Sequence, residues 1–451
     1  MKKLLLILLC SPMIGLGQWL TGLPDIDGEV DDDQSGYTVS LSDDGKIVAI
    51  GTPYNDGNGT DAGHVRIYEF DGSSWLKLGN DIDGEAAGDW SGCSVSISGD
   101  GSIVAIGAER NIGSAPAGPG GHVRIYSWDG SSWNQLGNDI DGSTVSEFSG
   151  NSVSLSSNGL TVAIGAARHS PSGQTRIYSW NGSSWNQLGQ AIEGEDNGDR
   201  SGSSVALSSD GSRVAIGAER NIGAGTQSWS QAGHVRVYNF NGSSWTQLGL
   251  DIDGTDNNGF SGSAVSLSED GNTLASGSGS VNGRVSIYRW GGNSWTQLGL
   301  DINGNGGDRL GSSISLSSSG DTAVIGAPDG SGSHYGAVKV YIYSGSSWVM
   351  YHQYDGWYPL EWFGSSVSLS SDGRTIAVGA TEKNATSTPT TKSGFVRFYS
   401  VLSTEILNIP NSAPHIVKIN NMLGQETYYR KNTLLFYLYD DGTVEKKIII
   451  E

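Results

Sequence analysis

A unit of roughly fifty residues occurs seven times in this chain, and this repetition constrains the fold more than any other feature. A repeat of that length is typical of arrays in which each copy is one supersecondary unit and neighbouring copies bury a continuous core. We therefore expect seven similar units arranged in series. The copies are spaced 49 to 60 residues apart and begin at Gly36, Gly92, Gly150, Gly202, Gly262, Gly311 and Gly364.

Each copy contains four segments with the pattern of β-strands. The first, such as 92–98, alternates Ser with Val, Ile or Leu and leads into Asp-Gly or a similar pair, which favours a hairpin turn. The second, such as 214–218, is apolar on both faces, as expected of a buried strand. The third has the pattern Gly-His-Val-Arg-Ile-Tyr (121–126), and the fourth begins with Ser-Ser-Trp, as at Trp133.

The seventh copy lacks a fourth segment, and the missing segment stands at the other end of the chain. Residues 18–28 match 74–84 in register, because Asp-Ile-Asp-Gly begins six residues after Trp19 and six residues after Trp75. Ends that complement each other in this way predict a closed ring. The expected fold class is therefore all-β, a seven-bladed β-propeller closed by the N-terminal strand, plus a small C-terminal β module.

The two ends of the chain differ from the repeat. Residues 1–17 combine two lysines, a short apolar run and small residues near the end, a pattern typical of a cleaved signal peptide. The propeller is expected over 18–402, a linker with two prolines over 403–414, and the C-terminal module over 415–451. Cleavage would leave one cysteine, Cys93, so no disulfide bond within the chain is expected.

The charge of the chain limits its partners. Its formal net charge is −21, and such a surface repels nucleic-acid phosphates and anionic lipid headgroups. We expect neither a nucleic-acid partner nor an integral membrane segment. The sequence also lacks a nucleophile turn, a phosphate loop and a dinucleotide fingerprint. A non-catalytic binding protein is therefore favoured, with a polysaccharide-active enzyme or a purely structural surface protein as alternatives.

Carboxylates concentrate in the connections between the fourth segment of one copy and the first segment of the next. One interpretation is a cation-assisted binding face, with calcium as the candidate ion because it prefers oxygen ligands. The other is solvated turns, in which Ile82 and Ile252 supply the packing. The candidate metal ligands are Asp81, Asp83, Asp251 and Asp253.

Three histidines share one position of the repeat, in Gly-His-Val-Arg. They are His64, His122 and His234. We interpret them as packing residues between blades. The remaining histidines, His169, His334, His352 and His415, are scattered and show no metal-ligand spacing.

Aromatic residues stand in the variable loops after the second segments and in the acidic connections, which alternation places on one face. Aromatic side chains on loops of a rigid scaffold can stack on sugar rings or anchor a protein partner. The alternative is that they fill gaps between blades. The candidate binding residues are Trp90, Trp229, Tyr335, Trp357, Tyr358 and Trp362.

The repeat resembles the FG-GAP family, found in integrin α-chain propellers and bacterial surface proteins. Phe363-Gly364 matches the family's opening, and Gly326-Ala327-Pro328 matches the motif after its second strand. The resemblance covers about residues 18–402 and implies a propeller fold of the kind found in cell-surface proteins. We expect this propeller to recognise a glycan or a protein through the face that carries the variable loops and the acidic connections. This chain departs from the family at 208–212, where the connection is too short to supply the six to eight ligands of a calcium loop.

The C-terminal tail resembles the sorting domain of the type IX secretion system. The matching segments are Asn-Met-Leu-Gly-Gln-Glu at 421–426, Leu-Phe-Tyr-Leu-Tyr at 435–439 and the run 441–450. The resemblance implies recognition by the type IX machinery and export across the outer membrane of a Gram-negative bacterium. The expected location is the outer cell surface or the medium.

Overall fold

The computed structural model describes the residues 19–21, 23–113, 118–222, 231–330, 335–382, 393–401, 416–420, 435–439 and 444–447. They fall into two compact units, the propeller and a C-terminal module. The module is an antiparallel sheet of β35 (Ile416–Asn420), β36 (Leu435–Tyr439) and β37 (Val444–Lys447), in that order. Among the described residues, no helix has the length and apolarity needed to span a bilayer.

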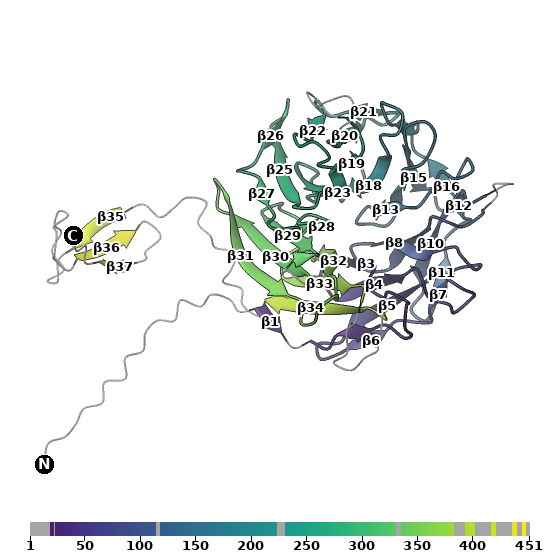
Figure 1. The fold of residues 1–451 in the computed structure, drawn as a ribbon, viewed down its shortest axis with the longest axis horizontal. Helices are drawn as coiled ribbons and strands as arrows, with labels where there is room; N and C mark the ends of the chain where they lie inside the picture. The colour runs from purple at the N-terminus through teal and green to yellow at the C-terminus, as the bar shows by residue number, and fades with distance from the viewer. Residues whose placement is uncertain are drawn as a thin grey trace, which may run out of the picture. The chain divides into compact units, whose positions relative to one another are not determined.

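Seven antiparallel sheets surround a common axis in the propeller (Figure 1). The first blade shows the plan, with β3 (Thr38–Leu41), β4 (Ile47–Thr52), β5 (His64–Phe70) and β6 (Trp75–Lys77) side by side. After β6 the chain turns and a fifth strand of two residues, β7 (Ile82–Asp83), pairs with the start of β5. Second strands are buried on both faces, as predicted.

The second to fifth blades repeat this plan. The second contains β8 (Ser91–Ile97), β9 (Ile103–Ala108), β10 (His122–Trp128), β11 (Trp133–Gln135) and β12 (Ile140–Asp141). The third contains β13 (Ser152–Leu155), β14 (Thr161–Ala166), β15 (Gln174–Trp180), β16 (Trp185–Gln187) and β17 (Ile192–Glu193). The fourth contains β18 (Ser201–Leu207), β19 (Arg213–Ala218), β20 (His234–Phe240), β21 (Trp245–Gln247) and β22 (Ile252–Asp253). The fifth contains β23 (Ser261–Leu267), β24 (Thr273–Ser278), β25 (Arg284–Trp290), β26 (Trp295–Gln297) and β27 (Ile302–Asn303).

The sixth blade differs in its outer strand. It consists of β28 (Ser313–Leu316), β29 (Thr322–Ala327), β30 (Ala337–Tyr343) and an uninterrupted β31 (Trp348–Asp355). In the first blade the corresponding stretch bends at Gly79, whose φ is +77°. The sixth blade has one residue fewer between its Trp and its Asp-Gly and no glycine at the bend, so the strand continues.

The seventh blade joins the two ends of the propeller. It contains β32 (Phe363–Leu369), β33 (Thr375–Ala380) and β34 (Phe395–Val401), and its outer strand is β1 (Trp19–Thr21). In the register of this pairing Trp19 lies opposite Val401, and β2 (Ile26–Asp27) pairs with the start of β34. The predicted fold class, including closure by the N-terminal strand, is confirmed.

Tryptophans at the start of the outer strands tie neighbouring blades together. The Trp133 indole N–H donates a hydrogen bond of 2.9 Å to the carbonyl oxygen of Leu78 in the preceding blade. Trp185, Trp245, Trp295 and Trp348 make the same bond to the leucine of the blade before them. In the first blade, the Trp75 ring lies against Phe398 of the seventh, with ring centroids 4.1 Å apart.

Candidate functional site

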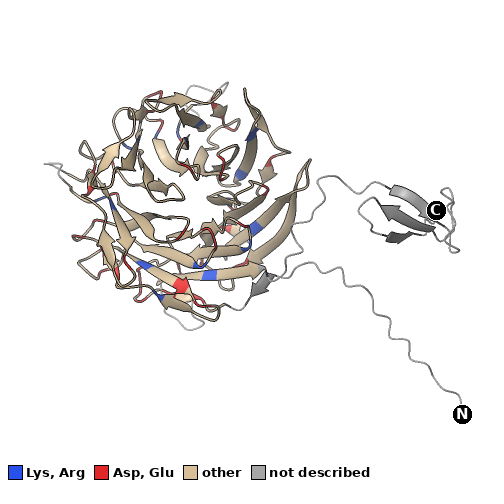
Figure 2. Ribbon diagram, turned by 180° about the vertical axis from the view of Figure 1, so that it is seen from behind, with Lys and Arg blue, Asp and Glu red and all other residues tan. Residues whose placement is uncertain are grey.

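The connections between blades and the loops after the second strands form one continuous face of the propeller. The backbone N–H of Trp90, in a connection, donates to the carbonyl of Asp61, in a loop. The backbone N–H of Arg110, in the next loop, donates to the carbonyl of Asp89 in the connection. We call this surface the loop face. Acidic residues are drawn in red in Figure 2 and lie largely in the turns and connections between strands.

One carboxylate in most connections is buried and holds the loop face in shape. Asp89 is 3% exposed and accepts hydrogen bonds of 2.9 Å from the backbone of Ala86 and from the Asn111 side chain. The acidic connections were interpreted either as a cation-binding face or as solvated turns. A buried carboxylate that holds a loop in shape fits neither interpretation. The buried carboxylates at corresponding positions are those of Asp33, Glu147, Asp199, Asp308 and Glu361.

Seven residues at one repeat position surround the propeller axis on the loop face, and we call them the axial ring. Each directly precedes an innermost strand or its opening turn and has φ between 51° and 58°. Bulky residues rarely adopt this left-handed backbone, and its cost is tolerated where the surrounding structure enforces it. Here the carbonyl of each residue accepts a hydrogen bond from the N–H three residues later. The ring consists of Gln34, Trp90, Phe148, Arg200, Phe260, Arg309 and Trp362.

Guanidinium groups and aromatic rings meet at the axial ring. The Arg110 guanidinium lies over the Trp90 ring, 3.4 Å from its centroid. The Tyr54 ring makes an edge-to-face contact with Trp90, with the two ring centroids 4.9 Å apart. Arg168 lies 4.5 Å from the Phe148 centroid. These contacts are cation–π interactions, which are worth about 0.5–1 kcal/mol each at exposed sites.

A pocket of about 190 Å³ opens between the second, third and fourth blades at this ring. Its lining includes Phe148, Arg168, Arg200, Glu109 and Glu219. Burial raises the pKa of Glu109, although the nearby Arg110 and Arg168 oppose this shift. The pocket is smaller than the 300–1,000 Å³ typical of small-molecule sites.

The structure places the predicted aromatic residues in three different settings. Trp90 and Trp362 belong to the axial ring. Trp357 and Tyr358 lie in the connection to the seventh blade, 60% and 37% exposed. Tyr335 is half-buried at the start of the sixth blade's third strand. The sixth candidate, Trp229, lies outside the described residues.

The sequence analysis did not identify the arginines and phenylalanines of this site. Arg110, Arg168, Arg200, Phe148 and Phe260 were not selected. The position shared by Phe148, Arg200 and Phe260 was nevertheless visible in the repeat, since each of the three directly precedes a Ser-Gly pair. Alignment of the repeat copies on this Ser-Gly pair would have identified these three residues.

Histidine and carboxylate side chains form three similar clusters between blades. Each contains a Glu, a His and an Asp whose ligand atoms lie within 4.8 Å of one another. Burial, and then the charge of Arg66, lowers the pKa of His64 to about 4, so the ring is neutral at pH 7. The clusters are Glu29–His64–Asp81, Glu85–His122–Asp139 and Glu195–His234–Asp251.

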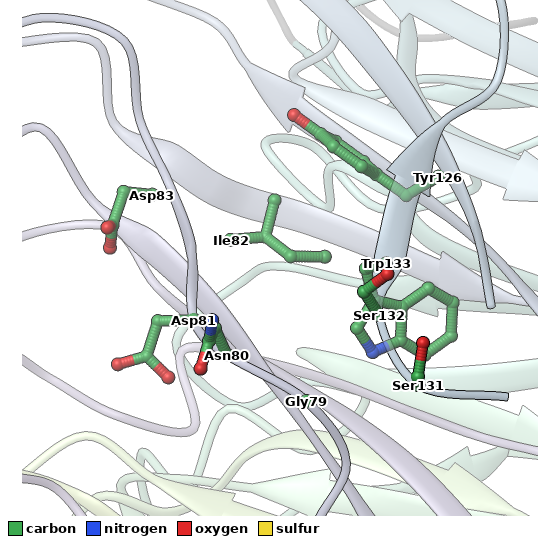
Figure 3. A pocket seen from close by; sticks show the side chains of 9 residues that line it. All are labelled: Gly79, Asn80, Asp81, Ile82, Asp83, Tyr126, Ser131, Ser132 and Trp133. Atoms are coloured by element: carbon green, nitrogen blue, oxygen red, sulfur yellow. The ribbon is translucent and has the colours of Figure 1, made fainter. Parts of the chain in front are cut away.

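The predicted metal ligands therefore divide into two kinds. Asp81 and Asp251 belong to clusters, whereas among the described residues Asp83 and Asp253 join none. Figure 3 shows Asp81 and Asp83 pointing away from Trp133, with Ile82 between them directed toward Tyr126. These residues line a pocket of about 270 Å³ at the junction of the first two blades.

No family model matches this chain, and no curated protein matches it.

Proposed function

We propose that this chain is a non-catalytic binding propeller that recognises a glycan through the axial ring of its loop face. The observation that supports the proposal is the ring itself. Seven residues, one from each blade and most of them aromatic or cationic, occupy one position of the repeat in a backbone conformation that is costly for residues of their size.

The chemistry of the ring suits carbohydrate. Aromatic faces stack on the apolar faces of sugar rings, and guanidinium and carboxylate groups hydrogen-bond to hydroxyls in defined directions. The pocket between Phe148 and Arg200 offers both kinds of group, with Glu109 and Glu219 beside the arginines. The exposed Trp357 supplies further aromatic surface on the same face. An extended glycan would contact several blades at once.

A glycan array probed with the full chain tests this proposal. We expect saturable binding to one class of glycan without release of product. R110A and R168A, which remove the cations stacked on ring aromatics, should each weaken binding about tenfold. R374A is the control, because Arg374 is a partly exposed arginine that follows the hairpin turn at the opposite ends of the innermost strands.

Three results would count against the proposal. Equal binding by R110A, R168A and R374A would move the ligand site away from the axial ring. Binding to a protein partner but to no glycan would show that the ligand is a protein rather than a glycan. Turnover of a polysaccharide, lost on replacing a carboxylate pair, would favour the enzyme.

We also propose that the chain is an FG-GAP-like propeller exported by the type IX secretion system to the outer cell surface or the medium. The basic and apolar start of residues 1–17 and the sorting-type motifs in 415–451 support this proposal. Fusing 403–451 to a periplasmic reporter in a bacterium that has this secretion system tests it. Retention of the reporter in the periplasm would overturn it.

A further inference from the structure

Two of the histidine clusters have the donor geometry of a metal site. In the second blade, His122 Nδ1 lies 3.8 Å from Glu85 Oε2 and 3.8 Å from Asp139 Oδ2. In the fourth blade, His234 Nδ1 lies 3.9 Å from Glu195 Oε2. These distances are too long for hydrogen bonds. They are close to the ~3.4 Å that separates two donors sharing a tetrahedral zinc ion at ~2.0–2.1 Å.

The imidazole rings in these clusters lack hydrogen-bond partners. His122 is 1% exposed and His234 is 0% exposed. Neither ring nitrogen of either histidine has a hydrogen-bond partner among the described residues. An unsatisfied buried polar group is destabilising, so each ring needs a partner that the described part of the chain does not provide.

Neighbouring side chains orient each carboxylate so that one oxygen is left for the cluster. Gln135 Nε2 donates a hydrogen bond of 2.6 Å to Asp139 Oδ1, while Oδ2 faces His122. In the fourth blade Gln247 makes the same bond to Asp251. Partners that fix the free oxygen in this way are typical of metal ligands.

The glutamates are oriented by arginines in the same manner. Arg124 Nη1 lies 3.8 Å from Glu85 Oε1, while Oε2 faces His122. Arg236 Nη1 lies 3.5 Å from Glu195 Oε1. The side chain of Glu85 is 45% exposed, so an ion can reach the buried histidine from solvent.

The repeat itself provides an internal comparison. A glutamate and a histidine occur together at these two positions in three blades, and the other four blades lack both. Joint loss is expected if the two residues serve one shared ligand. In the other four blades, other residues stand at the glutamate and histidine positions. These pairs, with the glutamate position first, are Ser143 and Gln174 in the third blade, Thr255 and Arg284 in the fifth, Asn305 and Ala337 in the sixth, and Trp357 and Phe395 in the seventh.

The fifth blade places a positive charge of its own at this location. Arg284 Nη1 lies 2.9 Å from Thr255 Oγ1 and 3.6 Å from Asp301 Oδ2, the residues at the glutamate and aspartate positions. In the first blade, Lys77 forms an ion pair with Asp81 beside His64. The scaffold therefore accommodates a cation at this point of the repeat. The second and fourth blades have no lysine at the position of Lys77, so no lysine at that position supplies the positive charge there.

We propose that Glu85–His122–Asp139 and Glu195–His234–Asp251 each bind one divalent transition-metal ion, with zinc as the representative. One imidazole nitrogen and two carboxylate oxygens form a ligand set that suits zinc and its neighbours in the first row, whereas calcium prefers oxygen alone. The three protein ligands leave a coordination position for water.

Each ion would connect two blades. Glu85 follows the last strand of the first blade, and His122 and Asp139 belong to the second. Glu195 likewise follows the third blade, and His234 belongs to the fourth. The bound metal would thus stabilise the ring at two junctions, independently of any glycan on the axial ring.

Zinc and cobalt binding to the full chain, stripped of metal with a chelator, test this proposal. The variants are H122Q, H234Q and their combination, and glutamine is a matched substitution because Gln174 fills the same position in the third blade. E69Q, which removes an exposed carboxylate outside the clusters, is the control. Calorimetry with Zn²⁺ gives stoichiometry, and the visible absorption of bound Co²⁺ reports a nitrogen-containing ligand set.

We expect two zinc ions per chain, one lost in each single variant and both in the combination, with E69Q unchanged. Zinc should raise the melting temperature of the wild type and leave that of the double variant unaffected. Zinc binding that persists in the double variant would overturn the proposal, as would the absence of saturable binding. Should H122Q fail to fold, E85S supplies the same test, because Ser143 fills that position in the third blade.

Discussion

The Ser366 hydroxyl donates a hydrogen bond of 2.8 Å to the carbonyl oxygen of Gly36, which lies 330 residues earlier in the chain. This bond belongs to a ring of contacts between the innermost strands of neighbouring blades. The matching hydroxyls of Thr38, Ser94, Ser152, Ser204 and Ser313 donate to a glycine carbonyl of the following blade. At the remaining position the chain has Ala264.

A second series of bonds runs around the same axis in the opposite direction and also has one gap. The backbone N–H of Leu207 donates to the Ser154 hydroxyl at 3.0 Å, and five other blades form the same bond. In the fourth blade the acceptor position is Ala206, which offers Leu267 no hydroxyl. We predict that A206S stabilises the propeller by about 0.5–1.5 kcal/mol, the usual net worth of one hydrogen bond.

Chemical denaturation of A206S and of S154A measures this effect. S154A removes the same bond one blade earlier and should destabilise by a similar amount. If S154A is destabilising and A206S is neutral, the gap at Ala206 is not a missing bond, and the prediction fails.

The N-terminal strand should contribute strongly to stability because it completes the seventh blade. Deleting residues 18–23 together with 1–17 removes β1 and exposes the edge of β34, including the backbone opposite Trp19 at Val401. We expect the melting temperature to fall by at least about 5 °C. In domains of 150–250 residues, each kcal/mol of lost unfolding free energy lowers the melting temperature by roughly 2–4 °C. The control is deletion of 1–17 alone. Equal melting temperatures for the two deletions would contradict closure by this strand.

The fold was predictable because the sequence encodes both the copies and their closure. Trp19 and Trp75 stand at the same distance from Asp-Ile-Asp-Gly, and this register is sufficient to assign the N-terminal residues to the last blade. The uninterrupted β31 was not predicted. It depends on the loss of one residue and of the glycine that bends the other outer strands, a local change that strand propensity does not detect.

The sites were only partly predictable, because their residues meet through packing between blades. Asp81 and Asp251 were selected as metal ligands, but their histidine and glutamate partners were not. Glu85 precedes His122 by 37 residues, and only the docking of the second blade on the first brings them together. Of the axial ring only Trp90 and Trp362 were selected, and its left-handed backbone was not predicted, since propensity argues against that conformation at Trp, Phe or Arg.

Glu147 should make the stability of the propeller depend on pH. Burial alone would raise the pKa of this carboxyl, but hydrogen bonds from His169, Thr144 and Ser143 outweigh it and hold the pKa below the ordinary 4.5. A carboxyl with a lowered pKa in the folded state stabilises the protein above pH 4.5, and this contribution is lost as the pH falls through the folded-state pKa. We predict that E147Q costs about 1–3 kcal/mol at pH 7.

The difference between wild type and E147Q should shrink as the pH is lowered below 4.5. Urea denaturation of both proteins at pH 7, 5 and 3.5 measures it. The amide of E147Q places a donor against the N–H of Thr144, which at present donates to the carboxylate. A difference that stays constant over this range would show that the carboxylate charge is not the cause.

The Cys93 thiol should be inert in the folded protein. It is 9% exposed and contacts the carbonyl oxygens of Gly107 and Gly150 at 3.4 and 3.6 Å. Burial, assisted by the charge of Glu109, raises the pKa of this thiol to about 12. Because the thiolate is the reactive form, only about one molecule in ten thousand would be reactive at pH 8.

Labelling of a C10S variant with a thiol reagent at pH 8 tests this expectation, since Cys93 is then the single cysteine. We expect labelling to be negligible in buffer and complete in guanidinium chloride. The same protein lacking residues 18–23 should label faster, because opening of the ring exposes the innermost strands, where Cys93 lies in β8. Fast labelling of the intact protein would show that the inner strands open without unfolding, and would contradict a ring held shut by its N-terminal strand.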